Sequence, residues 1–159
     1  MPYLKPVVLF DIDYTLFDTA FFKQSGLSVH KIYEEVMLVL ENLSSYATLG
    51  IYSTGVHDFQ KTKLEKTGMV KFFNEKDIHI FDDKDANLTR VLGKYKNSKI
   101  FLVDDKLTIL YSAKNHMEKI YTIWVKRGPF ADAQQPIFGF TPDAEVLNLS
   151  EIVSIINRN

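Results

Sequence analysis

Short uninterrupted runs of apolar residues alternate along the chain with longer segments in which apolar residues recur every three or four positions. Val7–Phe10 is such a run, typical of a strand that is buried on both faces of a sheet. The pattern predicts further strands over residues 48–52, 78–81, 100–103, 120–125 and 146–147, and helices over 30–43, 58–66, 88–95, 107–113 and 152–156. Strands and helices that alternate in this way predict an α/β fold with a mostly parallel sheet and helices on both of its faces.

The sequence also indicates where some of these elements end. Gly68 is placed to end the helix over 58–66, and Ser150 is placed to cap the last helix, over 152–156. Residues 128–142 hold three of the five prolines and two of the seven glycines, which predicts a long surface loop.

The composition limits the class of protein. The chain has 159 residues, of which 46% are hydrophobic, enough for one domain with a sizeable core and too many for intrinsic disorder. With 19 Lys and Arg residues against 20 Asp and Glu residues, charge does not indicate a nucleic-acid partner. The absence of cysteine excludes disulfides, thiolate metal sites and a cysteine nucleophile. Apolar runs such as Val36–Leu40 fall far below the roughly 18 residues of a membrane span, so we expect no membrane association and a cytoplasmic protein.

Residues that can carry out chemistry follow three of the predicted strands directly. The carboxyl ends of parallel strands meet along one edge of a sheet, and ligands bind there. Lys84, shortly after the strand over 78–81, belongs to the same edge. The candidates at this edge are Asp11, Asp13, Ser53, Thr54, Lys84, Asp104 and Asp105.

The carboxylates of Asp11, Asp104 and Asp105 would repel one another strongly in one small volume. A hard divalent cation removes that repulsion, and Mg²⁺ prefers oxygen ligands. With the cation bound, a phosphate dianion can approach, and Lys84 and the hydroxyl of Ser53 would bind its oxygens. The residue types therefore indicate phosphoryl chemistry with Mg²⁺.

Phosphoryl transfer also needs a nucleophile and a proton carrier. Asp11 would be the nucleophile and form an aspartyl-phosphate. Asp13 would protonate the leaving oxygen and then deprotonate the attacking water, because extended residues two apart project to the same side. Backbone amides in the turn over 11–14 could complete a site for the anion.

The sequence Asp11-x-Asp13-x-Thr15-Leu16-x-Asp18 resembles the first motif of the haloacid dehalogenase superfamily of phosphohydrolases. The motif is specific when, as here, it follows a hydrophobic strand. The resemblance implies a Rossmann-like three-layer α/β/α sandwich, dependence on Mg²⁺ and phosphatase-type hydrolysis. Since dehalogenases of the superfamily lack the second acid and its ion-pumping members carry Thr there, Asp13 favours a phosphatase.

The later motifs resemble those of the same family in type and order. Ser53 matches the hydroxyl of the second motif, Lys84 the lysine of the third, and Asp104-Asp105 the acidic fourth, so the resemblance covers roughly residues 6–110. It implies that the metal is held by the Asp11 carboxylate, by the Asp13 backbone carbonyl and by one or both aspartates of the fourth motif.

Some assignments keep alternatives. Thr54 competes with Ser53 as the main phosphate contact. Lys84 precedes Asp85, where relatives often have proline, and Ile109 stands where many relatives have a further aspartate. The lysines that compete with Lys84 are Lys76, Lys94 and Lys106. Lys126-Arg127 follows the strand over 120–125 at the same edge and would be placed to hold an anionic substrate.

Substrate choice in this superfamily commonly comes from a cap domain inserted after the first motif or after the third strand. Residues 19–29 and the few residues between Phe81 and Lys84 are too short for an independent fold. We therefore expect residues 1–159 to form a single hydrolase domain without a separate cap. Such an open site admits a small or a macromolecular phosphorylated substrate, or takes its lid from a second subunit in a homo-oligomer.

The sequence thus favours a Mg²⁺-dependent phosphohydrolase that acts on a phosphomonoester. One alternative is a non-catalytic or weakly catalytic phosphate-binding or interaction module on the same fold. Another is a phosphotransferase, which usually needs a cap to exclude water.

Overall fold

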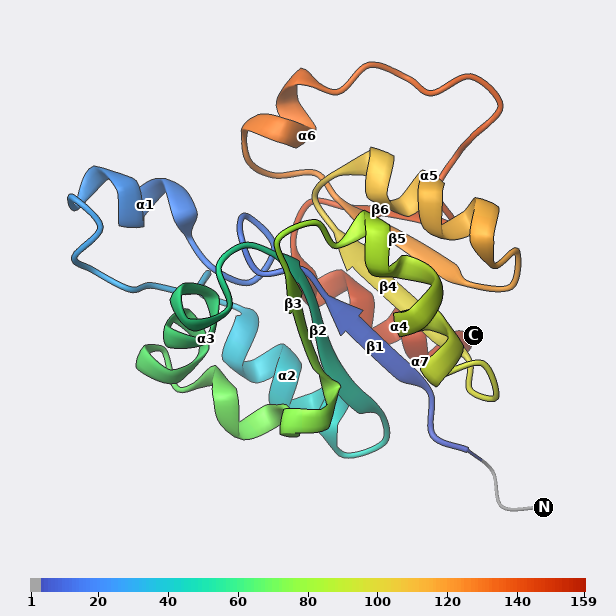
Figure 1. Cartoon of the computed structure of the whole chain (residues 1–159), viewed down its shortest axis with the longest axis horizontal. Coiled ribbons are helices and arrows are strands. Elements are labelled where there is room, and N and C mark those ends of the chain that lie inside the picture. The colour runs from blue at the N-terminus through green and yellow to red at the C-terminus, as the bar shows by residue number, and fades with distance from the viewer. Residues whose placement is uncertain (1–3) are drawn as a thin grey trace.

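The computed structural model describes residues 4–159, which fold around a six-stranded sheet (Figure 1). The strands are ordered β3-β2-β1-β4-β5-β6, and every neighbouring pair is parallel. Their bounds are β1 Val7–Phe10, β2 Thr48–Thr54, β3 Ile78–Phe81, β4 Ile100–Asp104, β5 Tyr121–Val125 and β6 Ala144–Val146. The predicted parallel sheet is confirmed.

Helices cover both faces of the sheet, which gives the three layers of an α/β/α sandwich (Figure 1). One core lies between the sheet and α2, α3 and α7, and a second lies between the sheet and α4 and α5. The helices are α1 Thr19–Gln24, α2 Val36–Ser44, α3 His57–Lys66, α4 Leu88–Lys94, α5 Leu107–His116, α6 Pro129–Ala133 and α7 Ile152–Arg158. The 3₁₀ turns are η1 Met69–Phe72, η2 Glu75–Asp77, η3 Asp85–Asn87 and η4 Leu149–Glu151.

The central strand β1 explains why an uninterrupted apolar run predicts this fold. Val8 and Phe10 pack into the core with α2 and α7, whereas Val7 and Leu9 pack into the core with α4 and α5. Burying one such side chain fully is worth roughly 1.5–3 kcal/mol. The strand therefore needs an apolar residue at every position, and the chain becomes polar only at Asp11, where β1 has ended.

The order of the strands reverses at β1. The chain adds β2 and β3 on one side of this strand and β4, β5 and β6 on the other. In open parallel sheets ligands bind at such a switch point, outside the carboxyl ends of the strands. Because Phe10 pairs with Val103 across β1 and β4, the next residues, Asp11 and Asp104, come side by side at this point.

The helix predicted over 30–43 begins later than expected. It starts at Val36, and before it Ile32 forms an antiparallel bridge with Phe17 while the Tyr33 amide donates to the Leu16 carbonyl. The backbone of this segment pairs with the loop after β1. Apolar spacing within the segment does not report such a pairing.

Ser150 does not cap the last helix, and this prediction is wrong. Asn148 supplies the cap: its side chain accepts from the Ser150 amide at 2.7 Å, and the Glu151 carboxylate accepts from the Asn148 amide at 3.2 Å. This capping box surrounds η4, which leads into α7. The loop predicted over 128–142 is also interrupted, by α6, whose first turn carries Pro129 where proline is well tolerated.

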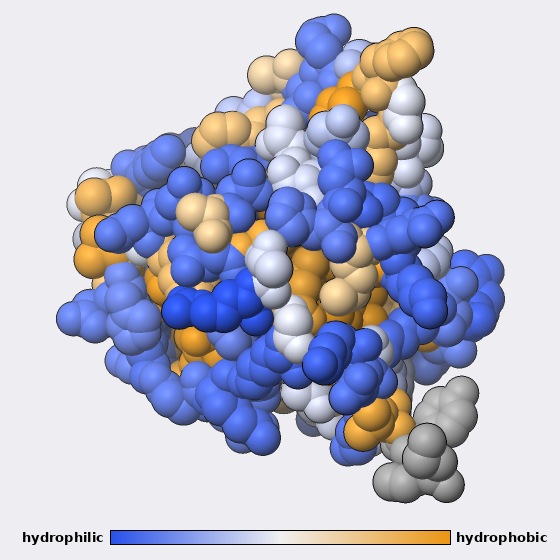
Figure 2. Space-filling view, turned by 45° about the vertical axis from the view of Figure 1, so that its right-hand side comes forward, coloured by the Kyte–Doolittle hydropathy of each residue, from blue (hydrophilic) through white to orange (hydrophobic). Residues whose placement is uncertain are grey.

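No helix among residues 4–159 combines the length and the apolar character required to cross a membrane. Figure 2 shows one face of the molecule, on which hydrophilic residues predominate and apolar residues emerge in separate patches. Leu147, predicted as part of the last strand, lies beyond β6 and is 72% exposed.

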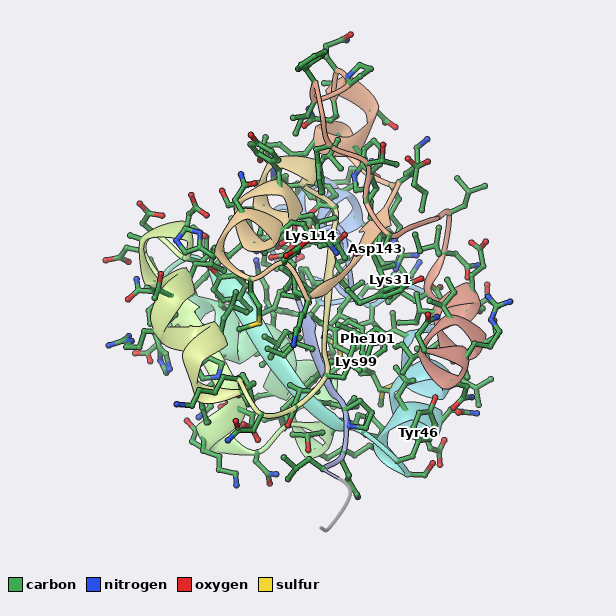
Figure 3. All side chains as sticks on the ribbon, turned by 90° about the vertical axis from the view of Figure 1, so that its right-hand side faces the viewer. Lys31, Tyr46, Lys99, Phe101, Lys114 and Asp143 are labelled. Atoms are coloured by element: carbon green, nitrogen blue, oxygen red, sulfur yellow. The ribbon has the colours of Figure 1, made fainter. Side chains whose placement is uncertain are left out.

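Asp143 links α5 to the strands β5 and β6, and Figure 3 shows it beside Lys114. Its Oδ2 accepts from Lys114 Nζ at 2.8 Å and from the amide and hydroxyl of Thr122 at 2.8 Å and 2.9 Å. Burial acts to raise the pKa of Asp143, but these donors outweigh burial and hold the pKa below its usual range. The ionised carboxylate therefore stabilises this part of the fold.

We expect Asp143→Ala to lower the free energy of unfolding at pH 7 by about 1–2 kcal/mol, because it removes three hydrogen bonds to a carboxylate. Since the folded-state pKa is depressed, the stabilisation is complete above the unfolded-state pKa of about 3.9 and is lost as the pH falls below it. Urea unfolding at pH 7 and at pH 3 measures the difference between variant and wild type, with the exposed Asp132→Ala as control. A difference that does not shrink at pH 3 would contradict this assignment.

Candidate active site

Lys84 brings the aspartates of two strands together. It follows β3 and is 3% exposed, and its Nζ lies 3.0 Å from Asp11 Oδ1 and 2.6 Å from Asp104 Oδ2. The ammonium also donates to the Tyr52 carbonyl at 3.2 Å, while the Tyr52 hydroxyl donates to the Lys84 carbonyl at 2.5 Å. Of the lysines considered from the sequence, Lys84 is the one that is bonded to these aspartates.

These contacts set the charge states of the pair. Burial acts to lower the pKa of Lys84, but Asp104 and Asp11 outweigh burial and hold the pKa above its usual range, so Lys84 is an ammonium. Burial and the charge of Asp104 raise the pKa of Asp11 to about 6, although Lys84 opposes the rise. At neutral pH Asp11 is therefore mainly ionised, the form that a nucleophile needs.

Asp105 is buried without donors. It is 1% exposed, and neither of its carboxylate oxygens has a hydrogen-bond partner among residues 4–159. Asp104, by contrast, accepts from Lys84 and, at 2.9 Å, from the Lys106 amide. Burial, together with the charges of Asp11 and Asp104, raises the pKa of Asp105 to about 10. Burying a carboxyl group without hydrogen-bond partners lowers the stability of the fold.

The three carboxylates form a group that can hold a metal ion. One oxygen from each of Asp11, Asp104 and Asp105 lies within 4.8 Å of the others. The oxygens of Asp105 lack a positive partner, and a set of carboxylate oxygens is what Mg²⁺ or another hard divalent cation takes. These side chains therefore fit such a cation, and Asp105 is the one that most needs it. The backbone carbonyl of Asp13 as a further ligand stays a prediction.

Three donors hold the side chain of Asp13. Lys63 Nζ lies 2.7 Å and Thr19 Oγ1 lies 2.9 Å from Oδ1, and Gln60 Nε2 lies 2.9 Å from Oδ2. Burial acts to raise the pKa of Asp13, but the charge of Lys63 and these hydrogen bonds outweigh it and lower the pKa. In this arrangement Asp13 is ionised, the form that accepts a proton.

The partners of Asp13 on α3 are not predicted by the sequence analysis. Gln60 and Lys63 are only 2% and 3% exposed, although most residues of α3 are polar. The overlooked signal is their spacing: positions three and four apart lie on one face of a helix, and Leu64 places this face in the core. The pairing of Lys63 with a residue 50 positions earlier, however, has no local signal.

The two hydroxyls at the end of β2 have different surroundings. Ser53 is fully buried, and its Oγ accepts from Gln60 Nε2 at 3.0 Å and donates to the Thr54 carbonyl at 3.2 Å. Thr54 is exposed, lines the cavity beside the aspartates, and accepts from the Lys84 amide at 3.3 Å. Gln60 thus covers Ser53, and Thr54 is the hydroxyl residue of β2 that lines the cavity. Which of the two contacts phosphate stays a prediction.

The aspartates open into a cavity of about 390 Å³. Residues of α1 and α6 line it, and Figure 1 shows these two helices on opposite sides of the sheet edge at which the strands end. Asp11 and Asp105 form its buried part, whereas Leu27, Phe59 and Phe130 are its most exposed apolar residues. Residues of α1 and α6 thus form part of the walls of this cavity.

Tyr14 fixes α6 next to the turn that follows β1. Its backbone adopts a φ of 61°, and its ring meets Phe130 edge-on at a centroid distance of 6.0 Å. Gly128 lies against the same ring: its φ is 87°, and a Cβ at this position would lie 2.7 Å from Tyr14 Cδ1. Glycine is therefore required here both for the backbone conformation and for space.

Arg127 does not face the cavity, so the prediction that Lys126-Arg127 holds an anionic substrate is not supported. Its guanidinium donates to the Glu35 carboxylate at 2.5 Å and to the Thr15 carbonyl, and it stacks on the ring of Tyr33 at 3.6 Å. Lys126 lies 3.4 Å from a glutamate of β6. Arg127 instead ties the end of β5 to the segments around the first motif.

The fold of this chain is similar to that of several solved structures. No protein-family profile and no protein with a curated description matches the sequence. A candidate haloacid dehalogenase-like hydrolase from Burkholderia xenovorans LB400 has a TM-score of 0.81 at 19% identity, with 99% of this chain and 98% of that chain covered. A candidate phosphatase from Clostridium difficile has a TM-score of 0.71 at 19% identity, with 96% and 98% covered. A 2-haloacid dehalogenase from Pseudomonas syringae pv. Tomato DC3000 has a TM-score of 0.68 at 14% identity, with 98% and 99% covered.

At identities this low the likeness shows a shared fold and not a shared reaction. The fold is the one that the motif resemblance implies, and that expectation is confirmed. The similar structures include both a candidate phosphatase and a dehalogenase. The reaction must therefore be argued from the residues at the site.

Proposed function

We propose that this chain, which has the fold of the haloacid dehalogenase-like hydrolases, is a Mg²⁺-dependent phosphatase that hydrolyses phosphomonoesters through Asp11. The observation that carries the proposal is Asp105, buried without donors beside an Asp11 that is bonded to Lys84. A divalent cation offsets the negative charge of the clustered carboxylates, and with the cation bound a phosphate dianion can approach Asp11.

Asp11 and Asp105, with Asp104 next to them, would hold the cation. When bound, it supplies positive charge that neutralises the phosphoryl oxygens. Lys84, which is hydrogen-bonded to Asp11, would supply a second positive charge. The exposed hydroxyl of Thr54 would supply a hydrogen-bond donor. Phosphoryl transfer depends mainly on positioning and charge neutralisation of this kind.

In the first step a carboxylate oxygen of Asp11 attacks phosphorus. The bond between Asp11 and phosphorus forms as the ester bond between phosphorus and the leaving oxygen breaks. The leaving oxygen takes a proton from Asp13. Because the partners of Asp13 hold it ionised in the free site, Asp13 has to take up this proton from solvent before the step. The products are an aspartyl-phosphate, the alcohol and an ionised Asp13.

In the second step a water molecule attacks the phosphorus of the aspartyl-phosphate and gives a proton to Asp13. The bond between Asp11 and phosphorus breaks, which releases inorganic phosphate and restores the Asp11 carboxylate. Lys63, Gln60 and Thr19 hold Asp13 in the ionised form that this step needs.

Dehalogenation of a haloacid is the competing reaction on this fold. There Asp11 would attack carbon, and the departing halide would need no proton. An alkoxide leaving group does need one. Asp13 lies two residues from the nucleophile and can supply this proton. The buried carboxyl group of Asp105 would be stabilised by a cation, so both residues favour hydrolysis of a phosphomonoester over dehalogenation.

We also propose that the chain is a single hydrolase domain without a separate cap. α1 and α6 serve in its place, because residues from both helices wall the cavity. Tyr14 and Gly128 hold α6 in this position.

Assays on the purified protein test the proposed function. Phenyl phosphate and other phosphomonoesters are incubated with Mg²⁺ or with EDTA, and released phosphate is measured; chloride release from 2-chloropropionate is measured in parallel. We expect Mg²⁺-dependent phosphate release and no chloride release. Chloride release without phosphate release would establish the competing reaction, and tight binding of both Mg²⁺ and a phosphate analogue with no turnover would favour the binding module.

The two hydroxyls of β2 give a separate prediction. Thr54→Val should raise the KM for phenyl phosphate about tenfold, because it removes a donor to a charged group. Ser53→Ala keeps the Thr54 hydroxyl but removes a hydrogen-bond partner of Gln60, which also holds Asp13. It should therefore change kcat more than KM. Steady-state kinetics of both variants measure the split. A larger KM effect for Ser53→Ala would restore the preference drawn from the sequence.

A further inference from the structure

We infer that the proposed phosphatase takes a small phosphomonoester whose leaving group has an apolar or aromatic body and carries a second negative charge, held by Lys23 and Lys106. The inference rests on the proposed function and adds the substrate class. It comes from one juxtaposition in the cavity that opens onto Asp11: two lysines without acidic partners among residues 4–159 lie beside a wall of aromatic rings.

The size of the cavity limits the substrate. A volume of about 390 Å³ lies within the range of small-molecule sites, roughly 300–1,000 Å³. Residues of both α1 and α6 line this cavity. A leaving group of the size of a substituted benzene ring fits such a space.

The chemistry of the wall favours an apolar body. Leu27, Phe59 and Phe130 line the cavity and remain about half exposed, at 54%, 48% and 49%. The ring of Tyr14 meets that of Phe130 edge-on. Exposed aromatic side chains around a cavity gain apolar contact when a ring enters it, which a sugar or glycerol body would not provide.

The two lysines are placed on this aromatic wall. Lys106 Nζ lies 4.2 Å from the ring centroid of Phe130, and Lys23 Nζ lies 5.7 Å from that of Tyr14. Long lysine side chains lie on apolar surface in this way while the ammonium stays free to bind an anion. Lys23 belongs to α1 and Lys106 precedes α5, so the cations reach the cavity from separate elements.

The other two lysines that line the cavity are already paired with aspartates. Lys84 is paired with Asp11 and Asp104, and Lys63 is paired with Asp13. Neither Lys23 nor Lys106 forms an ion pair within the described part of the chain, residues 4–159. Since Lys84 and a cation already neutralise the transferred phosphoryl group, the remaining positive charge suits a second anion, a carboxylate or a second phosphate.

Two pairs of probes test the inference in the presence of Mg²⁺. The unreactive pair is 3-carboxybenzylphosphonate and its amide, 3-carbamoylbenzylphosphonate, whose binding is measured by calorimetry. The reactive pair is 3-carboxyphenyl phosphate and 3-carbamoylphenyl phosphate. Each pair has the same shape and differs in one negative charge. We expect the charged member of each pair to be favoured about tenfold in Kd or in kcat/KM, as for two partly exposed ion pairs.

The preference for the charged member of each pair should disappear in the double variant Lys23→Gln, Lys106→Gln. The double control Lys96→Gln, Lys119→Gln makes the same change of charge before the amino ends of β4 and β5, on the opposite edge of the sheet, and should keep the preference. Melting curves check that each variant folds.

Two results would overturn the inference: no preference in wild type, or a preference that survives the double variant. If the preference survives while both members of a pair bind or react more weakly, the lysines bind the transferred phosphoryl group. Binding of the phosphonates with the expected preference but without hydrolysis of either phosphate would count against the proposed function and not against the second anion site.

Discussion

Asp11→Asn is expected to slow the hydrolysis of phosphomonoesters by roughly 1,000-fold or more, because the amide cannot form the aspartyl-phosphate. The loss should appear in kcat, since Thr54 and Lys84 remain to bind the phosphoryl group. The variant should fold, because it removes one of three carboxylates that crowd together. Steady-state release of phosphate from phenyl phosphate with Mg²⁺ measures the effect.

The matched control for this variant is Asp82→Asn. Asp82 is exposed, lies two residues before Lys84 and is close to the same sheet edge, so it tests the loss of a nearby negative charge alone. We expect its kcat/KM to stay within about twofold of wild type, as for most surface substitutions. Turnover by Asp11→Asn within tenfold of wild type would exclude Asp11 as the nucleophile.

The sheet was predictable from the sequence because its strands are buried on both faces. A strand such as β1 packs alternate residues into two cores, so it has to be apolar throughout and ends sharply at Asp11. The same sharp ends locate Asp104 and Lys84, since parallel strands gather their carboxyl ends. Topology and the main candidates of the site therefore follow from a local pattern.

The contacts of Asp13 and Ser53 were not predictable in this way. Both side chains are bonded to Gln60, and Asp13 is bonded to Lys63, which depends on how α3 is set against the end of β1. That placement is a tertiary property with no counterpart in the spacing of residues around Asp13. The different surroundings of Ser53 and Thr54 were not predictable for the same reason, because a side chain of α3 covers Ser53 alone.

Asp105 gives the second large prediction, in which one substitution stabilises the protein and disables the site. In EDTA at pH 7, we expect Asp105→Asn to be more stable than wild type by about 2–4 kcal/mol, a rise in Tm of roughly 5–10 °C. The folded-state pKa of Asp105 is raised to about 10, so the metal-free fold has to take up a proton that the unfolded chain does not bind at pH 7. Asparagine removes this cost and can donate to Asp11 or Asp104.

The sign of the pH dependence follows from the same shift. Between the unfolded-state pKa of about 3.9 and a folded-state pKa of about 10, the folded protein binds more protons, so metal-free wild type loses stability as the pH rises. Asp105→Asn should lack this part of the slope. Urea unfolding in EDTA at pH 5 and pH 8 measures both slopes, with Asp82→Asn as the control that behaves like wild type.

Mg²⁺ should reverse the order of stability. At a concentration about 100 times its Kd, the ion should add about 2.7 kcal/mol to wild type. Asp105→Asn removes the carboxylate whose oxygens have no donor among residues 4–159. The variant should therefore gain much less stability from Mg²⁺ and should lose phosphatase activity. A cation that replaces the proton bound at Asp105 predicts all of these signs: a variant that is more stable without metal, less responsive to metal, and inactive. An equal gain from Mg²⁺ in both proteins would place the cation elsewhere, because binding remote from Asp105 does not depend on whether this side chain is a carboxylate or an amide.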